Sequence, residues 1–147
     1  MHYSMAHLLA NLAGAALVGA LGWVAGVPAR FTWAWAAAWP LTQLGLLAEP
    51  SLLHYGGLSG VLHAGVAVAA LHLVLAGPGT QRRIALAILC GLVIKVLSES
   101  PWEGAHFDAA LGISVAPLAH ATGLAAGIAC SLGAWAVGSW ANQLVRG

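Results

Sequence analysis

The sequence predicts an all-α membrane protein in which five transmembrane helices form a single domain over residues 1–147. Of the 147 residues, 61% are hydrophobic and only 6% are charged, and the mean hydropathy is +0.88. Soluble domains carry about 25% charged residues. A chain this apolar is therefore expected to lie largely within a lipid bilayer, with too little remaining for a separate soluble domain.

Five apolar runs, at residues 8–27, 31–48, 59–76, 84–97 and 117–137, predict the transmembrane helices. A hydrocarbon core of about 30 Å is crossed by about 20 helical residues. The fourth run is short, so we expect its helix to extend to Arg83 and Ser98. Glycine and proline separate the runs, and the longest connection, residues 98–115, contains Pro101. This connection is expected to cover the functional site as a cap whose movement admits substrate.

Charged residues divide the connections into two sets. One set, with the C-terminal tail, carries Arg30, Arg82, Arg83 and Arg146. The other set carries Glu49, Glu99, Glu103 and Asp108. The positive-inside rule makes the arginine side cytoplasmic, so the N-terminus is expected to face outward. Lys95 departs from this sorting, and Glu99, one helical turn later, is its expected partner.

Four polar side chains are expected at one depth near the outer surface. Ser59 and His120 begin the third and the fifth apolar run, and His7 and Asn11, four residues apart, share one face of the first. Unpaired polar groups inside a membrane are costly and usually functional. A serine hydroxyl becomes a nucleophile when a base takes its proton, and histidine is such a base near neutral pH. The sequence therefore predicts a Ser59–His120 dyad.

The surroundings of the two residues suit acyl transfer. A helix that begins at Ser59 presents its positive dipole end to an oxyanion, and His7 and Asn11 would add side-chain donors. The helices must also lie close together, which small residues at four-residue spacing permit. Such residues follow each member of the dyad: Gly60 and Ala64, Gly123 and Gly127.

Three segments resemble the signature motifs of the rhomboid intramembrane serine proteases, in that family's order. They are His2-Tyr3-Ser4-Met5-Ala6-His7-Leu8-Leu9-Ala10-Asn11, Gly57-Leu58-Ser59-Gly60 and Ala119-His120-Ala121-Thr122-Gly123. The resemblance implies a rhomboid-like helical bundle with Ser59 as nucleophile, His120 as base, and His7 with Asn11 as oxyanion-stabilising residues. It also implies a part in substrate binding, or in packing on the catalytic histidine, for Gly57 and His63. His63 stands where many rhomboids carry an aromatic residue.

Rhomboids have a six-helix core with the serine on the fourth helix and the histidine on the sixth. Here the two fall on the third and fifth, so the resemblance implies that the first helix of the core is missing, through truncation or a misplaced start codon. Small size, the run from Tyr55 to His63, and Lys95 followed by Glu99 are most similar to the bacterial rhombosortase subgroup.

That similarity implies a multi-pass protein of the bacterial inner membrane with its active site open to the periplasm. Its partners would be the bilayer and a membrane-anchored protein whose transmembrane tail, of a C-terminal Gly-Gly type, is cut near the outer face. Whether water or an amine receives the acyl group is left open.

Each of these residue types also occurs in purely structural roles. Ser59 alone fits a helix cap, His120 a buried hydrogen-bonded histidine, and His63 a packing residue. An inactive rhomboid-like protein that binds transmembrane helices is one alternative function, and a histidine-ligated metal or haem protein is another. The sequence has no His-Glu-x-x-His or Cys-x-x-Cys motif, so neither a metal nor another cofactor is expected. Five basic residues in separate loops give no support for nucleic-acid binding.

The remaining histidines, cysteines and tryptophans receive structural assignments. His2, His54, His72 and His106 are expected in loops or at the membrane interfaces. Cys90 and Cys130 are expected to be small buried residues without a disulfide. Interfacial anchoring is expected, at least in part, for Trp33, Trp35, Trp39, Trp102, Trp135 and Trp140.

Overall fold

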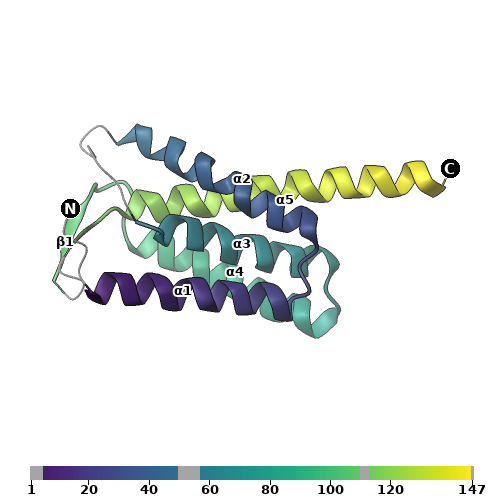
Figure 1. Cartoon of the computed structure of the whole chain (residues 1–147), viewed down its shortest axis with the longest axis horizontal. Coiled ribbons are helices and arrows are strands. Elements are labelled where there is room, and N and C mark those ends of the chain that lie inside the picture. Colours follow the sequence, from purple (N-terminus) through teal and green to yellow (C-terminus); the bar gives the residue numbers. More distant parts are fainter. Residues whose placement is uncertain (1–4, 50–56, 110–112, 147) are drawn as a thin grey trace.

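The computed structural model describes residues 5–49, 57–109 and 113–146. In these residues five α-helices form a bundle: α1 Met5–Val24, α2 Ala29–Gly45, α3 Ser59–Ala76, α4 Gly79–Ser98 and α5 Pro117–Arg146. A 3-10 turn, η1 Leu46–Ala48, follows α2 directly, and two short antiparallel strands, β1 His106–Asp108 and β2 Ile113–Val115, form a hairpin between α4 and α5 (Figure 1). The predicted all-α class and the number of helices are confirmed.

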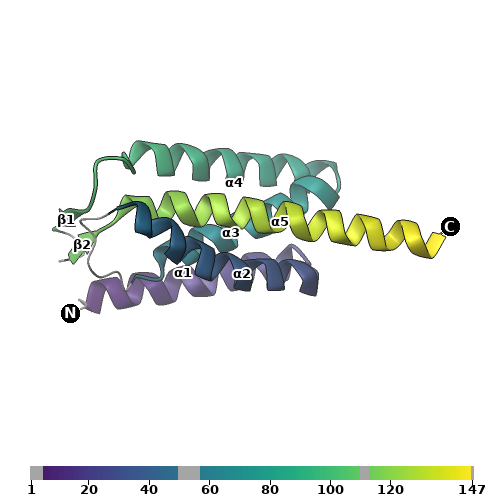
Figure 2. The same cartoon turned by 90° about the horizontal axis from the view of Figure 1, so that it is seen from above.

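Two helices, α4 and α5, are longer than the apolar runs that predicted them. The fourth begins at Gly79 because Gln81, Arg82 and Arg83, though polar, have good helix propensity and continue the helix beyond the apolar run. The fifth continues to Arg146 and projects past the other helices (Figure 2). The hairpin was not predicted, since strands of three residues are too short to show an alternating pattern.

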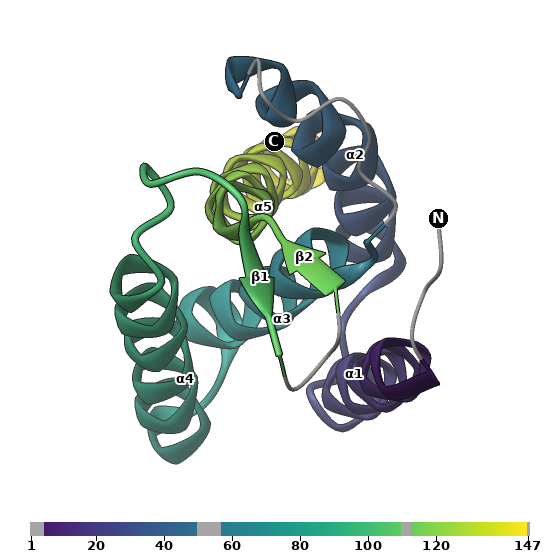
Figure 3. The ribbon, with the colours of Figure 1, turned by 90° about the vertical axis from the view of Figure 1, so that its left-hand side faces the viewer.

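Helix α3 is the centre of the bundle. It contacts each of the other four helices, and most of its residues are buried. Seen from the end, α1 and α4 stand on either side of α3, while α2 and α5 pack on its other face (Figure 3). Helix α1 packs chiefly against α3 and is more exposed than α3 or α5. The residues at the start of α3 are therefore surrounded by the remaining helices.

The close packing of α3 on α5 depends on the small residues that the sequence pointed to. A Cβ atom added at Gly123 would collide with the carbonyl oxygen of Gly60, and one added at Gly60 would lie 2.5 Å from the carbonyl oxygen of Ala119. Four residues further along, a Cβ at Gly127 would lie 2.6 Å from the carbonyl oxygen of Ala64. The predicted packing of small residues is confirmed, and it fixes the start of α5 against the start of α3.

Among the described helices, three are long and apolar enough to cross a membrane: α1, α3 and the Pro117–Ala141 part of α5. Helix α2 has 17 residues, and α4 carries two arginines in its first turns and Lys95 in its last. The charges are sorted as expected. Arg30 and Arg82 lie near the starts of α2 and α4, and Glu49 and Glu99 follow the opposite ends of the same two segments.

Two side-chain assignments are corrected, those of Trp35 and Cys90. Trp35 is not an interfacial anchor, because its indole N–H donates to the carbonyl oxygen of Val61 at 2.8 Å and joins α2 to α3. His72 lies in α3 and is buried, with its ring 4.9 Å from that of Phe31. Cys90 is exposed. Uniformly apolar helices have no polar stripe to indicate which face points inward, so such errors are expected. His2 and His54 lie outside the described residues.

Replacing Gly123 with alanine should destabilise the fold by about 1 to 3 kcal/mol, because the added methyl group overpacks the helix crossing. The matched control is Gly133→Ala in the same helix, where a Cβ atom meets nothing within 4 Å. Alanine there should be neutral or slightly stabilising. Unfolding of the full chain in detergent, followed by tryptophan fluorescence, measures both variants, and equal effects would contradict the crossing geometry.

Candidate active site

The structure brings together the two residues of the predicted dyad. Ser59 is the first residue of α3, and His120 lies in the first turn of α5. The Ser59 hydroxyl and the Nε2 atom of His120 are 2.9 Å apart, although 61 residues separate them in the chain. This is the distance expected between a serine nucleophile and its base.

Glu99 contacts the other nitrogen of the His120 ring. Its Oε2 atom lies 2.6 Å from Nδ1 of His120. An ionised carboxylate can only accept, so the proton of a neutral ring is on Nδ1 and its Nε2 atom is left to accept from the Ser59 hydroxyl. The sequence alone predicted Glu99 only as a partner of Lys95. Its position directly after the C-terminal end of the fourth helix was the available signal.

Lys95 links Glu99 to a second histidine. Its ammonium group donates to Oε1 of Glu99 at 2.9 Å, which confirms the predicted pair. It also donates to Nε2 of His63 at 2.7 Å. The separation between Lys95 Nζ and His120 Nδ1 is longer, at 3.4 Å. Because Glu99 Oε2 lies closer to His120 Nδ1, at 2.6 Å, the Nδ1 proton is donated to Glu99. Lys95 is then a nearby positive charge and not a donor to that ring.

His63 packs on His120, as its place in the sequence predicts. The two rings are stacked, with centroids 4.2 Å apart and an interplanar angle of 13°. Nδ1 of His63 lies 2.7 Å from the carbonyl oxygen of Ser59 and donates to it. Nε2 is then free of a proton and accepts from Lys95. His63 therefore holds one face of the His120 ring while both of its own nitrogens are bonded.

The charges of Glu99 and Lys95 balance within the site. Burial alone would raise the pKa of Glu99, but the hydrogen bonds from Lys95 and His120 outweigh it and lower the pKa below its usual value. Glu99 is thus ionised at neutral pH, and its side chain is 29% exposed. The negative charge of Glu99 and the positive charge of Lys95 lie beside His120, and the two together have no net charge.

A cavity of about 510 Å³ opens at the dyad and runs between α1 and α4 over α3. His7 and Asn11 of α1 line it together with Ser59, and Asn11 Nδ2 lies 2.9 Å from His7 Nε2. These two residues therefore reach the site that the sequence predicts for them. Gly57, just before α3, is outside the lining. The remaining wall, away from the dyad, is mostly apolar: Ala10, Gly14, Leu17, Val18, Leu21, Leu62, Val66 and Leu92.

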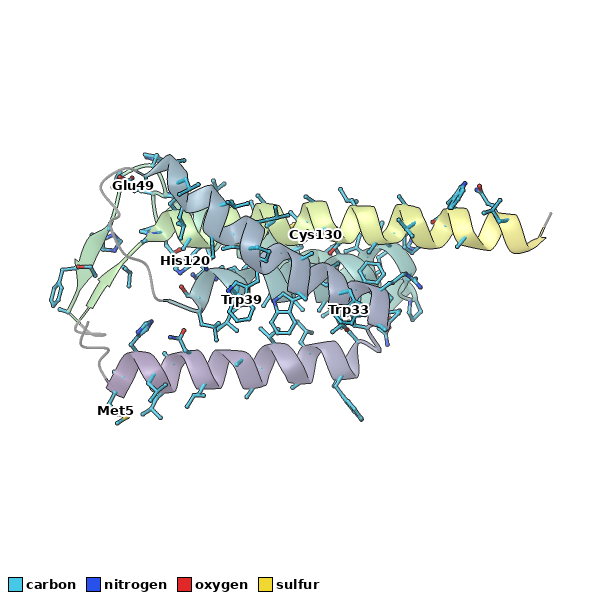
Figure 4. All side chains as sticks on the ribbon, turned by 45° about the horizontal axis from the view of Figure 1, so that its top comes forward. Met5, Trp33, Trp39, Glu49, His120 and Cys130 are labelled. Atoms are coloured by element: carbon cyan, nitrogen blue, oxygen red, sulfur yellow. The ribbon has the colours of Figure 1, made fainter. Side chains whose placement is uncertain are left out.

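Part of the long connection between α4 and α5 contributes to the cavity mouth. His106 of β1 and Val115 of β2 belong to its lining. The hairpin lies across the end of the bundle at which α3 and α5 begin (Figure 3). His120 lies at that end with Glu49 and Met5, whereas Trp33 lies toward the other (Figure 4). The described part of the connection thus borders the cavity, and its role as a movable cap stays a prediction.

Within residues 5–49, 57–109 and 113–146, no group of three or more histidine, cysteine, aspartate or glutamate side chains is arranged to hold a metal ion. Comparison of the chain with family models, with curated proteins and with solved structures finds no match. The function is therefore inferred from the geometry of the site.

The Glu99 carboxylate should stabilise the fold in a pH-dependent manner. Because folding lowers its pKa, its contribution is fully present above the usual value of about 4.3 and is lost as the pH falls through the lowered value. The difference in unfolding free energy between wild type and Glu99→Gln should shrink as the pH falls below the usual glutamate value of about 4.3. Glu103→Gln, which removes an exposed carboxylate of the same connection, controls for the lost charge. Identical curves for the two variants would contradict the assignment.

Proposed function

We propose that this protein is an intramembrane serine endopeptidase with a rhomboid-like helical bundle. The observation that carries the proposal is the 2.9 Å contact between the Ser59 hydroxyl and His120 Nε2 at the end of a largely apolar cavity. Three further features surround the contact: Ser59 lies at the N-terminus of a helix, His7 and Asn11 line the same cavity, and there is open space beside the hydroxyl. A histidine that only needed a hydrogen-bond partner would require none of them. Nucleophilic catalysis requires all three.

The chemistry follows from the two atoms in contact. Ser59 Oγ attacks a peptide carbonyl carbon as its proton passes to His120 Nε2, and the carbonyl oxygen becomes an oxyanion. When the C–N bond breaks, His120 gives that proton to the leaving amine and an acyl-Ser59 ester remains. Water, or an amine acceptor, then attacks the ester while His120 takes its proton. Return of the proton to Ser59 Oγ restores the site.

The oxyanion has donors on two sides. Ser59 starts α3, and the first turn of a helix presents backbone N–H groups that the helix itself does not satisfy. His7 and Asn11 face the same cavity from α1. A single oxyanion donor typically contributes about a hundred- to a thousandfold to the rate. The shared lining of Ser59, His120, His7 and Asn11 supports their proposed roles as nucleophile, base and polar donors.

The substrate is inferred from the walls of the cavity. Away from the dyad, the lining between α1 and α4 becomes apolar and ends near Leu21, Val66 and Leu92. An apolar peptide segment should bind this wall more tightly than a polar one, because burial of each apolar side chain contributes about 1.5 to 3 kcal/mol to the free energy of binding. We therefore propose the transmembrane tail of a membrane-anchored protein as substrate.

The charges suggest where such a tail is cut. Glutamates follow α2 and α4 at the end that holds the dyad, and arginines lie at the opposite end. The positive-inside rule places the dyad near the outer face, which is the periplasmic face in a bacterial inner membrane. A helix must unwind before its carbonyl can reach Ser59, so a tail with a Gly-Gly pair at that depth is favoured.

A fluorophosphonate probe should label wild-type protein, and Ser59→Ala should abolish the labelling. The probe reacts only with a serine whose proton a base can take, so His120→Ala should reduce labelling by about a hundredfold or more. Ser98→Ala is the matched control, since Ser98 is exposed at the same end of the bundle and should not contribute. Labelling that survives Ser59→Ala would exclude the proposed nucleophile, and a wild type that never labels would favour an inactive protein that binds transmembrane helices.

His7→Ala or Asn11→Ala should slow cleavage of a membrane-anchored reporter by about tenfold or more, because each removes a polar group that the proposal assigns to the oxyanion. The control is Leu9→Ala, a substitution on the same helix at a side chain that is 58% exposed. Initial rates of product release measure the effect. The oxyanion role is wrong if both variants cleave at the wild-type rate while Ser59→Ala is inactive.

A further inference from the structure

We propose that Glu99 is a positioning residue for His120 and completes a Ser59–His120–Glu99 triad. The proposal rests on the proposed function of the same site and goes beyond its two-residue mechanism. In it, the carboxylate keeps the Nδ1 proton of His120 in place. It also compensates the positive charge that the ring gains when Ser59 transfers its proton.

The geometry forms a continuous path of hydrogen bonds. Ser59 Oγ lies 2.9 Å from one ring nitrogen of His120, and Glu99 Oε2 lies 2.6 Å from the other. The second distance is at the short end for nitrogen and oxygen, as in charge-assisted hydrogen bonds. Glu99 therefore selects the tautomer in which Nε2 can accept the serine proton. A ring with the opposite tautomer would direct an N–H at Ser59 and could not act as its base.

Further contacts keep Glu99 in this position. Its second oxygen, Oε1, accepts from Lys95 at 2.9 Å, and Lys95 also donates to His63 at 2.7 Å. Since His63 stacks on His120, three linked side chains, those of Glu99, Lys95 and His63, lie around the base. The backbone contributes as well, because Ser100 adopts a φ of 50°, in the left-handed region, directly after Glu99. Such a conformation is uncommon for a residue other than glycine, and it ends α4 at the carboxylate.

The nearby lysine makes a carboxylate necessary here. Lys95 Nζ lies 3.4 Å from His120 Nδ1, so an imidazolium would form next to a positive charge. Like charges at this distance oppose proton transfer to the ring. With Glu99 present, the new charge forms beside a neutral ion pair. Loss of Glu99 alone should therefore do more harm than loss of Glu99 and Lys95 together.

The test measures the rate at which a fluorophosphonate labels Ser59 across pH in the full chain. Glu99→Gln should reduce the neutral-pH rate by about tenfold to a thousandfold and move the acidic limb of the profile to lower pH, since the imidazolium loses its counter-charge. Glu99→Asp should recover part of the rate, and so should Lys95→Met combined with Glu99→Gln. Glu103→Gln should change neither rate nor limb. Groups that also titrate or carry charge around the cavity are His7, His63, Lys95 and His106.

A purely structural role for Glu99 gives a different result. The rate would then fall only in step with the unfolding midpoint, the acidic limb would stay in place, and adding Lys95→Met would not recover activity. Any of these outcomes overturns the proposal.

Nitrogen NMR of the histidine rings tests the proposal even if the wild type is never labelled. Wild-type His120 should show a protonated Nδ1 and an unprotonated Nε2 at neutral pH, and Glu99→Gln should move the ring toward a mixture and lower its titration midpoint. An unchanged tautomer and midpoint in Glu99→Gln would overturn the positioning role. Failure of the protease proposal would appear separately, as absent or Ser59-independent labelling.

Discussion

The approach of two helix backbones at Gly60 and Gly123 is the constraint on which the rest of the site depends. A Cβ atom on either residue would meet the backbone of the opposite helix. Ser59 precedes the first of these glycines and His120 lies one turn before the second, so the crossing fixes the separation of their reactive atoms. The two polar residues are close because two residues without side chains lie beside them.

A cluster of polar groups at this crossing carries a cost in apolar surroundings. Buried polar groups that lack partners destabilise a fold by about 1 to 3 kcal/mol each, and charged groups by more. Here the cost is limited, because both nitrogens of His63 and of His120 have partners and because Lys95 and Glu99 neutralise each other. The cluster also lies at the end of the bundle, where the Lys95 side chain is 46% exposed. Partial exposure and complete pairing together make an ionic group tolerable there.

The sequence was sufficient for the parts of the fold that depend on composition and spacing. Apolar run length predicted five helices, and small residues at four-residue spacing predicted the α3–α5 contact. The direction of each side chain was harder, since an apolar helix does not mark its buried face. Trp35 and Cys90 were misplaced for that reason, and the contact of Glu99 with His120 depends on the exact end of α4. Periodicity does not fix a helix end to within one residue.

The loose attachment of α1 has a further consequence for the site. This helix packs chiefly on α3, is largely exposed along its length, and carries His7 and Asn11 into the cavity wall. An outward swing of α1 would widen the cavity and, in the same motion, withdraw these two donors from Ser59. In the proposed mechanism, a position of α1 that widens the cavity would therefore also remove His7 and Asn11 from the oxyanion.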